Sequence, residues 1–141
     1  MYPTFKKPVN ILKKIGNLTT PFGGSTRGES WHPGVDIAAP EGSPIPAITP
    51  GIVSSVQKSN NGFGNTVTVN APNGDVQQFA HLQKALVKPG QKVVPGQNIA
   101  KMGSSGNTYS PSNGSASHLD LRIVSMYGKY KNPYLYLQNF K

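Results

Sequence analysis

The sequence contains no cysteine, so neither a disulfide nor a thiolate metal site can stabilise the fold. Acidic residues are scarce as well, with five Asp and Glu against fourteen Lys and Arg. Long apolar runs are also missing, and their absence argues against a membrane-spanning helix. The opening stretch MYPTFKKPVNILKKIGNL lacks the apolar core of a signal peptide. We therefore expect this chain to have no membrane span and no signal peptide.

The shortage of acidic residues leaves a formal net charge of +9, spread along the chain from Lys6 to Lys141. A basic surface of this kind favours an anionic partner, such as nucleic acid, anionic lipid or the polyanionic wall of a bacterium. No basic stripe interleaved with aromatic residues is present, so we expect no nucleic-acid partner. Charge alone does not choose between the remaining partners.

The 141 residues suit one domain, and sixteen Gly and thirteen Pro are scattered among short stretches rich in Val and Ile. This pattern predicts short strands joined by tight turns, hence a single all-β, antiparallel domain with few or no long helices. Residues 9–18 fit either a helical turn or an early strand, and we expect 1–18 to be an extension and 19–141 the domain. The expected strands include 35–39, 51–59, 65–71, 75–82 and 117–124.

The three histidines of the sequence stand close to acidic residues or at strand ends. His32 lies four residues before Asp36 in HPGVD, and His81 lies near the end of the strand stretch FAHL. His118 and Asp120 are two apart in HLD, so strand alternation places them on one face, about 6–7 Å apart. His32, Asp36 and Asp120 could therefore supply three ligands of a zinc site, with the other two histidines beside it. The competing interpretation is that these are ordinary hydrogen-bonded or exposed histidines.

An ordered set of motifs over residues 19–124 resembles the lysostaphin-like (LytM-type) zinc metallopeptidases, which cut peptide cross-links of bacterial peptidoglycan. The resemblance rests on TTPFGGSTRGESWHPGVDIAAPEGSPIPAITPGIV, on NGFGNTVTVNAPNGDVQQFAHL, on VKPGQKVVPGQNIAKMGSSG and on HLDLRI. It covers about three quarters of the chain. It implies the barrel-like β fold of that family and one Zn²⁺ per chain.

The resemblance also implies a role for each histidine and its acidic neighbours. The first two zinc ligands of the family fall on His32 and Asp36, and its two catalytic histidines fall on His81 and His118. The third ligand, the second histidine of an H-x-H motif, falls on Asp120, so this chain departs from the family there. Carboxylate oxygen is an accepted zinc ligand, and the resemblance therefore predicts a His/Asp/Asp site.

Further expectations concern the surroundings of that site. Arg122 shares the face of Asp120 if the strand alternates, so an ion pair between them is the alternative to metal binding by Asp120. The Gly- and Ser-rich loops 22–31 and 103–117 are expected to flank the histidines as groove walls. Trp31, Tyr109 and Arg122 are the candidate substrate contacts. A milder departure from the family is a phenylalanine, Phe79, where many relatives have tyrosine.

The sequence thus predicts a zinc-dependent endopeptidase that hydrolyses peptide cross-links or stem peptides of peptidoglycan. We expect it to act on the bacterial cell envelope as an extracellular or phage virion-associated enzyme, and to be a monomer. The competing hypothesis is a catalytically inactive module of the same fold that binds the wall, regulates a partner enzyme or serves as a structural component. Measurements of metal content and of cell-wall clearing distinguish these two hypotheses.

Overall fold

The computed structural model describes residues 8–25, 29–106, 108 and 116–139. Within them, the two helices are short, and neither is long and apolar enough to cross a membrane. The elements are α1 Pro8–Ile15, β1 Asn17–Thr20, β2 Val35–Ala38, β3 Pro44–Pro46, β4 Gly51–Gln57, β5 Asn65–Asn70, β6 Val76–Ala85, β7 Lys92–Val93, β8 Asn98–Met102, β9 His118–Val124, β10 Tyr130–Lys131 and α2 Pro133–Asn139.

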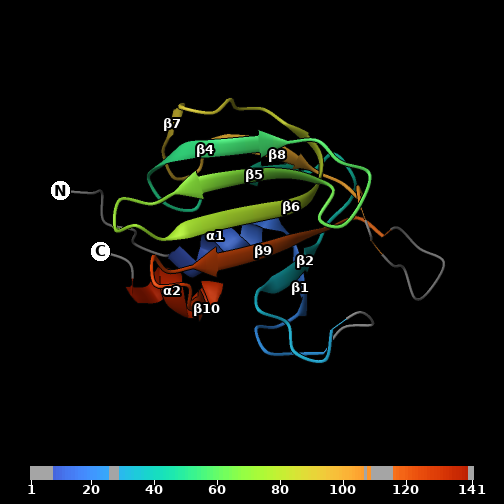
Figure 1. Ribbon diagram of the computed structural model, residues 1–141. Helices are drawn as coiled ribbons and strands as arrows, with labels where there is room; N and C mark the ends of the chain where they lie inside the picture. Colours follow the sequence, from blue (N-terminus) through green and yellow to red (C-terminus); the bar gives the residue numbers. More distant parts are fainter. Residues whose placement is uncertain (1–7, 26–28, 107, 109–115, 140–141) are drawn as a thin grey trace.

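The strands form one antiparallel sheet in the order β1-β2-β9-β6-β5-β4-β7. In addition, β10 pairs with β9, and β8 pairs with both β3 and β6. Figure 1 shows β4, β5, β6 and β9 side by side, with α1 behind them and α2 and β10 below. The predicted all-β antiparallel fold with only short helices is therefore confirmed.

Strand β9 shows how the sequence builds both a core and a polar face. Leu119, Leu121 and Ile123 are fully buried, and they alternate with the polar residues at 118, 120 and 122. Because successive side chains of a strand point to opposite faces, one face of β9 packs into the core and the other carries the charged residues. The core thereby fixes the position of the polar row.

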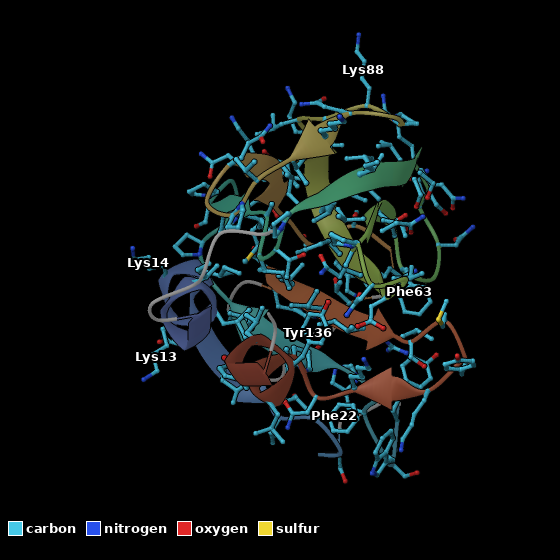
Figure 2. All side chains as sticks on the ribbon, turned by 90° about the vertical axis from the view of Figure 1, so that its left-hand side faces the viewer. Lys13, Lys14, Phe22, Phe63, Lys88 and Tyr136 are labelled. Carbon is cyan, nitrogen blue, oxygen red and sulfur yellow. The ribbon has the colours of Figure 1, made fainter. Side chains whose placement is uncertain are left out.

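The N-terminal segment, which fitted a helix or a strand, contains both. Helix α1 buries Leu12 and Ile15 in the main core, while Lys13 and Lys14 point away from the body (Figure 2). Strand β1 follows at once and pairs with β2, so it begins inside the segment expected to be an extension. An apolar face of α1 covers the sheet because residues 12 and 15 lie one turn apart.

Helix α2 docks on the body through a buried polar cluster. Tyr136 of α2 is 8% exposed, and it lies between the helix and the sheet (Figure 2). The Gln77 side-chain amide lies near the Tyr136 hydroxyl and donates a 2.7 Å hydrogen bond to Thr49 Oγ1. Buried Asp75 accepts a 2.9 Å bond from the Lys131 ammonium. The segment around Tyr136 therefore packs along the body.

Candidate metal centre and active site

The site is built on β9, which lies between β2 and β6. Asp120 is directly opposite Asp36 of β2 on one side and Ala80 of β6 on the other. Two like charges directly opposite each other destabilise a sheet unless a positive group lies between them. Both side chains are nevertheless largely buried, at 13% exposure for Asp36 and 6% for Asp120. Their pairing therefore calls for a cation.

The loop before β2 brings His32 over these carboxylates. Backbone hydrogen bonds close the loop at its neck, from Gly23 N to His32 O at 2.7 Å and from His32 N to Gly24 O at 2.8 Å. The chain then passes so close to β9 that a Cβ on Gly34 would lie 2.4 Å from the Leu121 carbonyl oxygen. Only glycine allows this approach, so the HPGVD spacing has a steric reason.

The three candidate ligands meet at distances suited to a metal. His32 Nε2 lies 2.9 Å from Asp36 Oδ1 and 3.8 Å from Asp120 Oδ1. One ligand atom from each residue lies within 4.8 Å of those of the other two. Ligand atoms of a tetrahedral zinc site are about 3.3 Å apart, given metal–ligand bonds of about 2.0–2.1 Å. The residues present fit a zinc ion with small adjustments.

Hydrogen bonding of His32 gives independent evidence that a positive charge belongs here. Its Nδ1 lies 3.0 Å from Glu29 Oε1, and a carboxylate oxygen is only an acceptor, so Nδ1 carries a proton. Its Nε2 faces carboxylate oxygens of Asp36 and Asp120. A bare nitrogen lone pair would repel these oxygens, so either a proton or a metal ion must occupy the space between them.

The pKa values of His32 and Asp36 agree with this requirement. Burial lowers the pKa of His32, but the hydrogen bond and charge of Asp36 outweigh it and raise that pKa above its usual value. Burial raises the pKa of Asp36, yet the hydrogen bond and charge of His32 hold it below its ordinary value. The Asp36 carboxylate is therefore ionised at neutral pH and able to bind a cation.

A β-bulge turns His81 towards the same site. The register between β5 and β6 shifts between Val67↔Phe79 and Asn65↔Leu82, so Ala80 and His81 together face a single residue of β5. His81 has a φ of 63°, in the left-handed region, and its N–H donates to the Phe63 carbonyl at 2.8 Å. Such strained residues persist only where their surroundings fix them. The sequence pattern, read as a regular strand, did not indicate this bulge.

His81 and His118 are held in matching ways. Each donates through Nδ1 to a backbone carbonyl, that of Ser105 at 2.8 Å for His81 and that of Ala116 at 2.9 Å for His118. Because a carbonyl oxygen only accepts, both protons lie on Nδ1, and Nε2 is the atom left to exchange a proton. Burial lowers the pKa of His81, which keeps its ring neutral at neutral pH.

Arg122 binds Asp120, and it also binds a second carboxylate. Its Nε and Nη2 donate to Oδ1 and Oδ2 of Asp120, both at 3.0 Å. The same Nη2 donates to Glu29 at 3.1 Å, and the guanidinium lies 4.7 Å from the ring centre of Phe63. The expected shared face is therefore observed. The ion pair and the three-ligand cluster coexist, so the structure does not present them as alternatives.

Of the other two candidate substrate contacts, the structure describes Trp31 but not Tyr109. Trp31 is 53% exposed and packs edge-on against Phe22, with ring centres 5.0 Å apart. Tyr109 lies outside the described residues. Ser105 was missed by sequence reasoning, although its hydroxyl donates to the Leu82 carbonyl at 2.6 Å and its carbonyl holds His81. The Gly/Ser stretch GSSG at 103–106 was the only signal in the sequence.

Comparison with known proteins identifies the class to which this fold and site belong. The model of peptidase family M23 matches residues 30–133, which includes the candidate ligands and both facing histidines. The chain therefore belongs to peptidase family M23, and its domain is of the LytM/lysostaphin type, as the sequence resemblance implied.

Curated relatives with sequence similarity carry two different descriptions. The chain is 37% identical over 103 residues to the peptidoglycan DD-endopeptidase ShyC of Vibrio cholerae, covering 72% of this chain and 22% of ShyC. It is 32% identical over 122 residues to the murein hydrolase activator NlpD of Escherichia coli, covering 86% of this chain and 29% of NlpD. The chain thus spans less than a third of either relative.

Solved structures with sequence similarity to this chain share its fold. The catalytic domain of lysostaphin from Staphylococcus simulans superposes with a TM-score of 0.71 at 28% identity, over 99% of this chain and 100% of that domain. A zinc-containing peptidase from Vibrio cholerae gives the same TM-score of 0.71 at 25% identity, over 94% of this chain and 38% of the other. The fold and the family are thereby shown.

Proposed function

We propose that this domain is a zinc-dependent endopeptidase that hydrolyses peptide cross-links or stem peptides of bacterial peptidoglycan. The observation that carries the proposal is the convergence of two groups on one face of the sheet. His32, Asp36 and Asp120 offer three ligand atoms. Beside them, His81 and His118 each donate a hydrogen bond from Nδ1 to a backbone carbonyl, which leaves Nε2 free to exchange a proton. The names of relatives such as ShyC support the substrate class.

When bound, a zinc ion supplies a Lewis acid that polarises the scissile carbonyl. The ligands His32, Asp36 and Asp120 would hold it. His81 is neutral at neutral pH, so its Nε2 can take a proton from the attacking water. The Nε2 of His118 lies 3.9 Å from Asp36 Oδ1, at the edge of the ligand cluster, where it can accept a hydrogen bond from the attacking water and so orient it. Once it has taken up a proton on Nε2, the same ring can donate to the developing oxyanion.

The surroundings of the site fit a wall polymer as substrate. The net charge of +9 favours adsorption to anionic wall polymers, and this attraction weakens with salt. We infer that the enzyme acts on the cell envelope, in keeping with the relative named as a DD-endopeptidase of peptidoglycan. Virion association and a monomeric state stay predictions.

The test combines metal analysis with turbidity loss of purified cell walls. We expect about one zinc per chain, wall clearing that a chelator abolishes, and recovery on adding zinc back. Asp120→Ala should lose both metal and clearing, because it removes one of three ligands. Full clearing by metal-free protein would contradict the proposal. An Asp120→Ala protein that keeps its zinc would remove Asp120 from the ligands.

The similarity to the murein hydrolase activator NlpD favours a second candidate, an inactive module that binds the wall and stimulates a partner hydrolase. This candidate predicts no clearing by the domain alone. It also predicts that Asp36→Ala stimulates a murein hydrolase as well as the unaltered domain does. Clearing that depends on Asp36 would exclude it.

A further inference from the structure

Arg122 occupies an unusual position between two carboxylates. Its side chain is 11% exposed, and it makes a two-pronged ion pair with Asp120 and a third contact with Glu29. The ring of Phe63 covers the guanidinium at 4.7 Å. A planar guanidinium that is held by two carboxylates through Nε and Nη2 has little freedom to rotate, so its position fixes the orientation of the Asp120 carboxylate.

Glu29 links this arginine to the opposite ligand. One oxygen, Oε1, lies 3.1 Å from Arg122 Nη2 and 3.0 Å from His32 Nδ1. The contacts thus form a ring that runs from Asp120 through Arg122 and Glu29 to His32. The ring closes where His32 Nε2 faces Asp120 Oδ1 at 3.8 Å. Two of the three candidate metal ligands are therefore held by one carboxylate–guanidinium pair.

The charges of the pair cancel, so it changes the orientation of the ligands more than their total charge. Arg122 contributes +1 and Glu29 contributes −1, which leaves the two charges of Asp36 and Asp120 to balance a divalent ion. A carboxylate offers about four lone-pair directions, and the guanidinium takes two of those on Asp120. Oxygen Oδ1 keeps a direction towards His32 and a metal.

We propose that Glu29 and Arg122 are positioning residues that orient His32 and Asp120 for metal binding, and that they allow aspartate to serve where the lysostaphin-like pattern has histidine. Aspartate is shorter than histidine, so an unsupported carboxylate would sample several rotamers. The pair fixes one of them. This inference rests on the proposed metal function of the site.

The test measures zinc affinity directly, by competition with a chromophoric chelator, together with the visible spectrum of the Co²⁺-loaded protein. We expect Arg122→Gln and Arg122→Lys both to weaken zinc binding by about 10–100-fold, since lysine keeps the charge but cannot form the two-pronged contact. The cobalt spectrum should also change, because the geometry of Asp120 changes.

If Arg122 instead opposed metal binding, its replacement would change the zinc affinity in the opposite direction. If the guanidinium only repels the metal or withholds Asp120 from it, Arg122→Gln would tighten zinc binding, and that result would overturn the inference. Unchanged affinity in both arginine variants would overturn it as well.

Glu29 provides the second arm of the test. Glu29→Ala should weaken zinc binding about as much as Arg122→Gln, and the double variant should lose less than the two losses combined because the pair acts as one unit. If the losses of zinc affinity in the two single variants added fully in the double variant, the two residues would not act as one unit, and the inference would be contradicted. Lys131→Gln breaks the ion pair with Asp75 elsewhere in the fold, and its zinc affinity should equal that of the unaltered protein.

Failure of the inference is distinguishable from failure of the proposed function. An unaltered protein that binds no zinc would overturn both. A protein that binds zinc and clears walls, but whose Glu29 and Arg122 variants keep full affinity, would overturn the positioning role alone.

Discussion

His81 and His118 face each other with ring centres 4.9 Å apart, although they belong to different strands and are tied to different backbone carbonyls. Neither ring is among the three candidate ligands. The two rings therefore lie apart from the three candidate ligands, and the proposed function assigns proton transfer to the rings and metal binding to the ligands.

This separation predicts different losses for the two groups. His81→Gln and His118→Gln should each lower kcat for wall peptides by about 10²–10⁴-fold, the usual contribution of a general acid or base, while zinc content stays at the level of the unaltered protein. Single-turnover assays and metal analysis on the same samples measure both quantities. Loss of zinc from either variant would place that histidine among the ligands.

The glycine at 106 supports the position of His81 indirectly. A Cβ at residue 106 would lie 2.4 Å from both the Gly62 carbonyl oxygen and the Gly64 nitrogen. The φ of Gly106 is 77°, in the region that favours glycine. Gly106→Ala should therefore lower the free energy of unfolding by about 3 kcal/mol or more, from overpacking and backbone strain together. It should also lower activity, because the adjacent Ser105 carbonyl holds His81.

Gly90→Ala is the matched control for that variant. Gly90 has a similar φ of 90°, but no other group lies within 4 Å of the place that a Cβ would take. This variant should cost only the backbone strain, about 1–2 kcal/mol, with activity retained. Equal thermal destabilisation in the two variants would show that packing at residue 106 does not matter.

The buried tyrosine of α2 predicts a loss of stability at high pH. Burial raises the pKa of Tyr136 to about 12, from an ordinary value of 10 in the unfolded chain. The folded state holds the phenol proton more tightly, so this contribution is fully present below pH 10 and lost as the pH rises towards 12, by at most about 3 kcal/mol. Urea unfolding between about pH 8 and 11.5 measures it.

Tyr136→Phe removes the ionisable group and should flatten this part of the stability curve. Other lysines and tyrosines titrate in both proteins, so the difference between the two curves isolates Tyr136. A constant difference across the whole pH range would contradict the role of burial.

The exposed ring of Trp31 predicts an effect on substrate binding rather than on chemistry. It stands next to the candidate ligand His32 and is 53% exposed. Trp31→Ala should raise KM several-fold while kcat and zinc content change little. Tyr127→Ala is the control, because Tyr127 is 90% exposed in the turn after β9, beyond the end of the strand remote from His118. A fall in kcat alone would assign Trp31 a different role.

The sequence predicted the fold class and the candidate residues because both depend on local patterns. Alternation in HLDLRI places His118, Asp120 and Arg122 on one face, and the Gly of HPGVD permits the close passage over β9. Two features were not predictable. The bulge at His81 depends on its pairing with β5, and the bridge from Glu29 to Arg122 joins residues 93 positions apart. Both arise from contacts between distant segments.

The backbone hydrogen bonds that close the loop before β2 also affect how the sequence of such a domain can vary. Two backbone hydrogen bonds join His32 to Gly23 and Gly24, and they involve no side chain. Apart from Glu29, whose carboxylate contacts His32, residues of the loop can therefore be replaced, inserted or deleted without displacing that candidate ligand. Under the proposed function, a different wall peptide can be accommodated by altering the loop while the proposed zinc site stays unchanged.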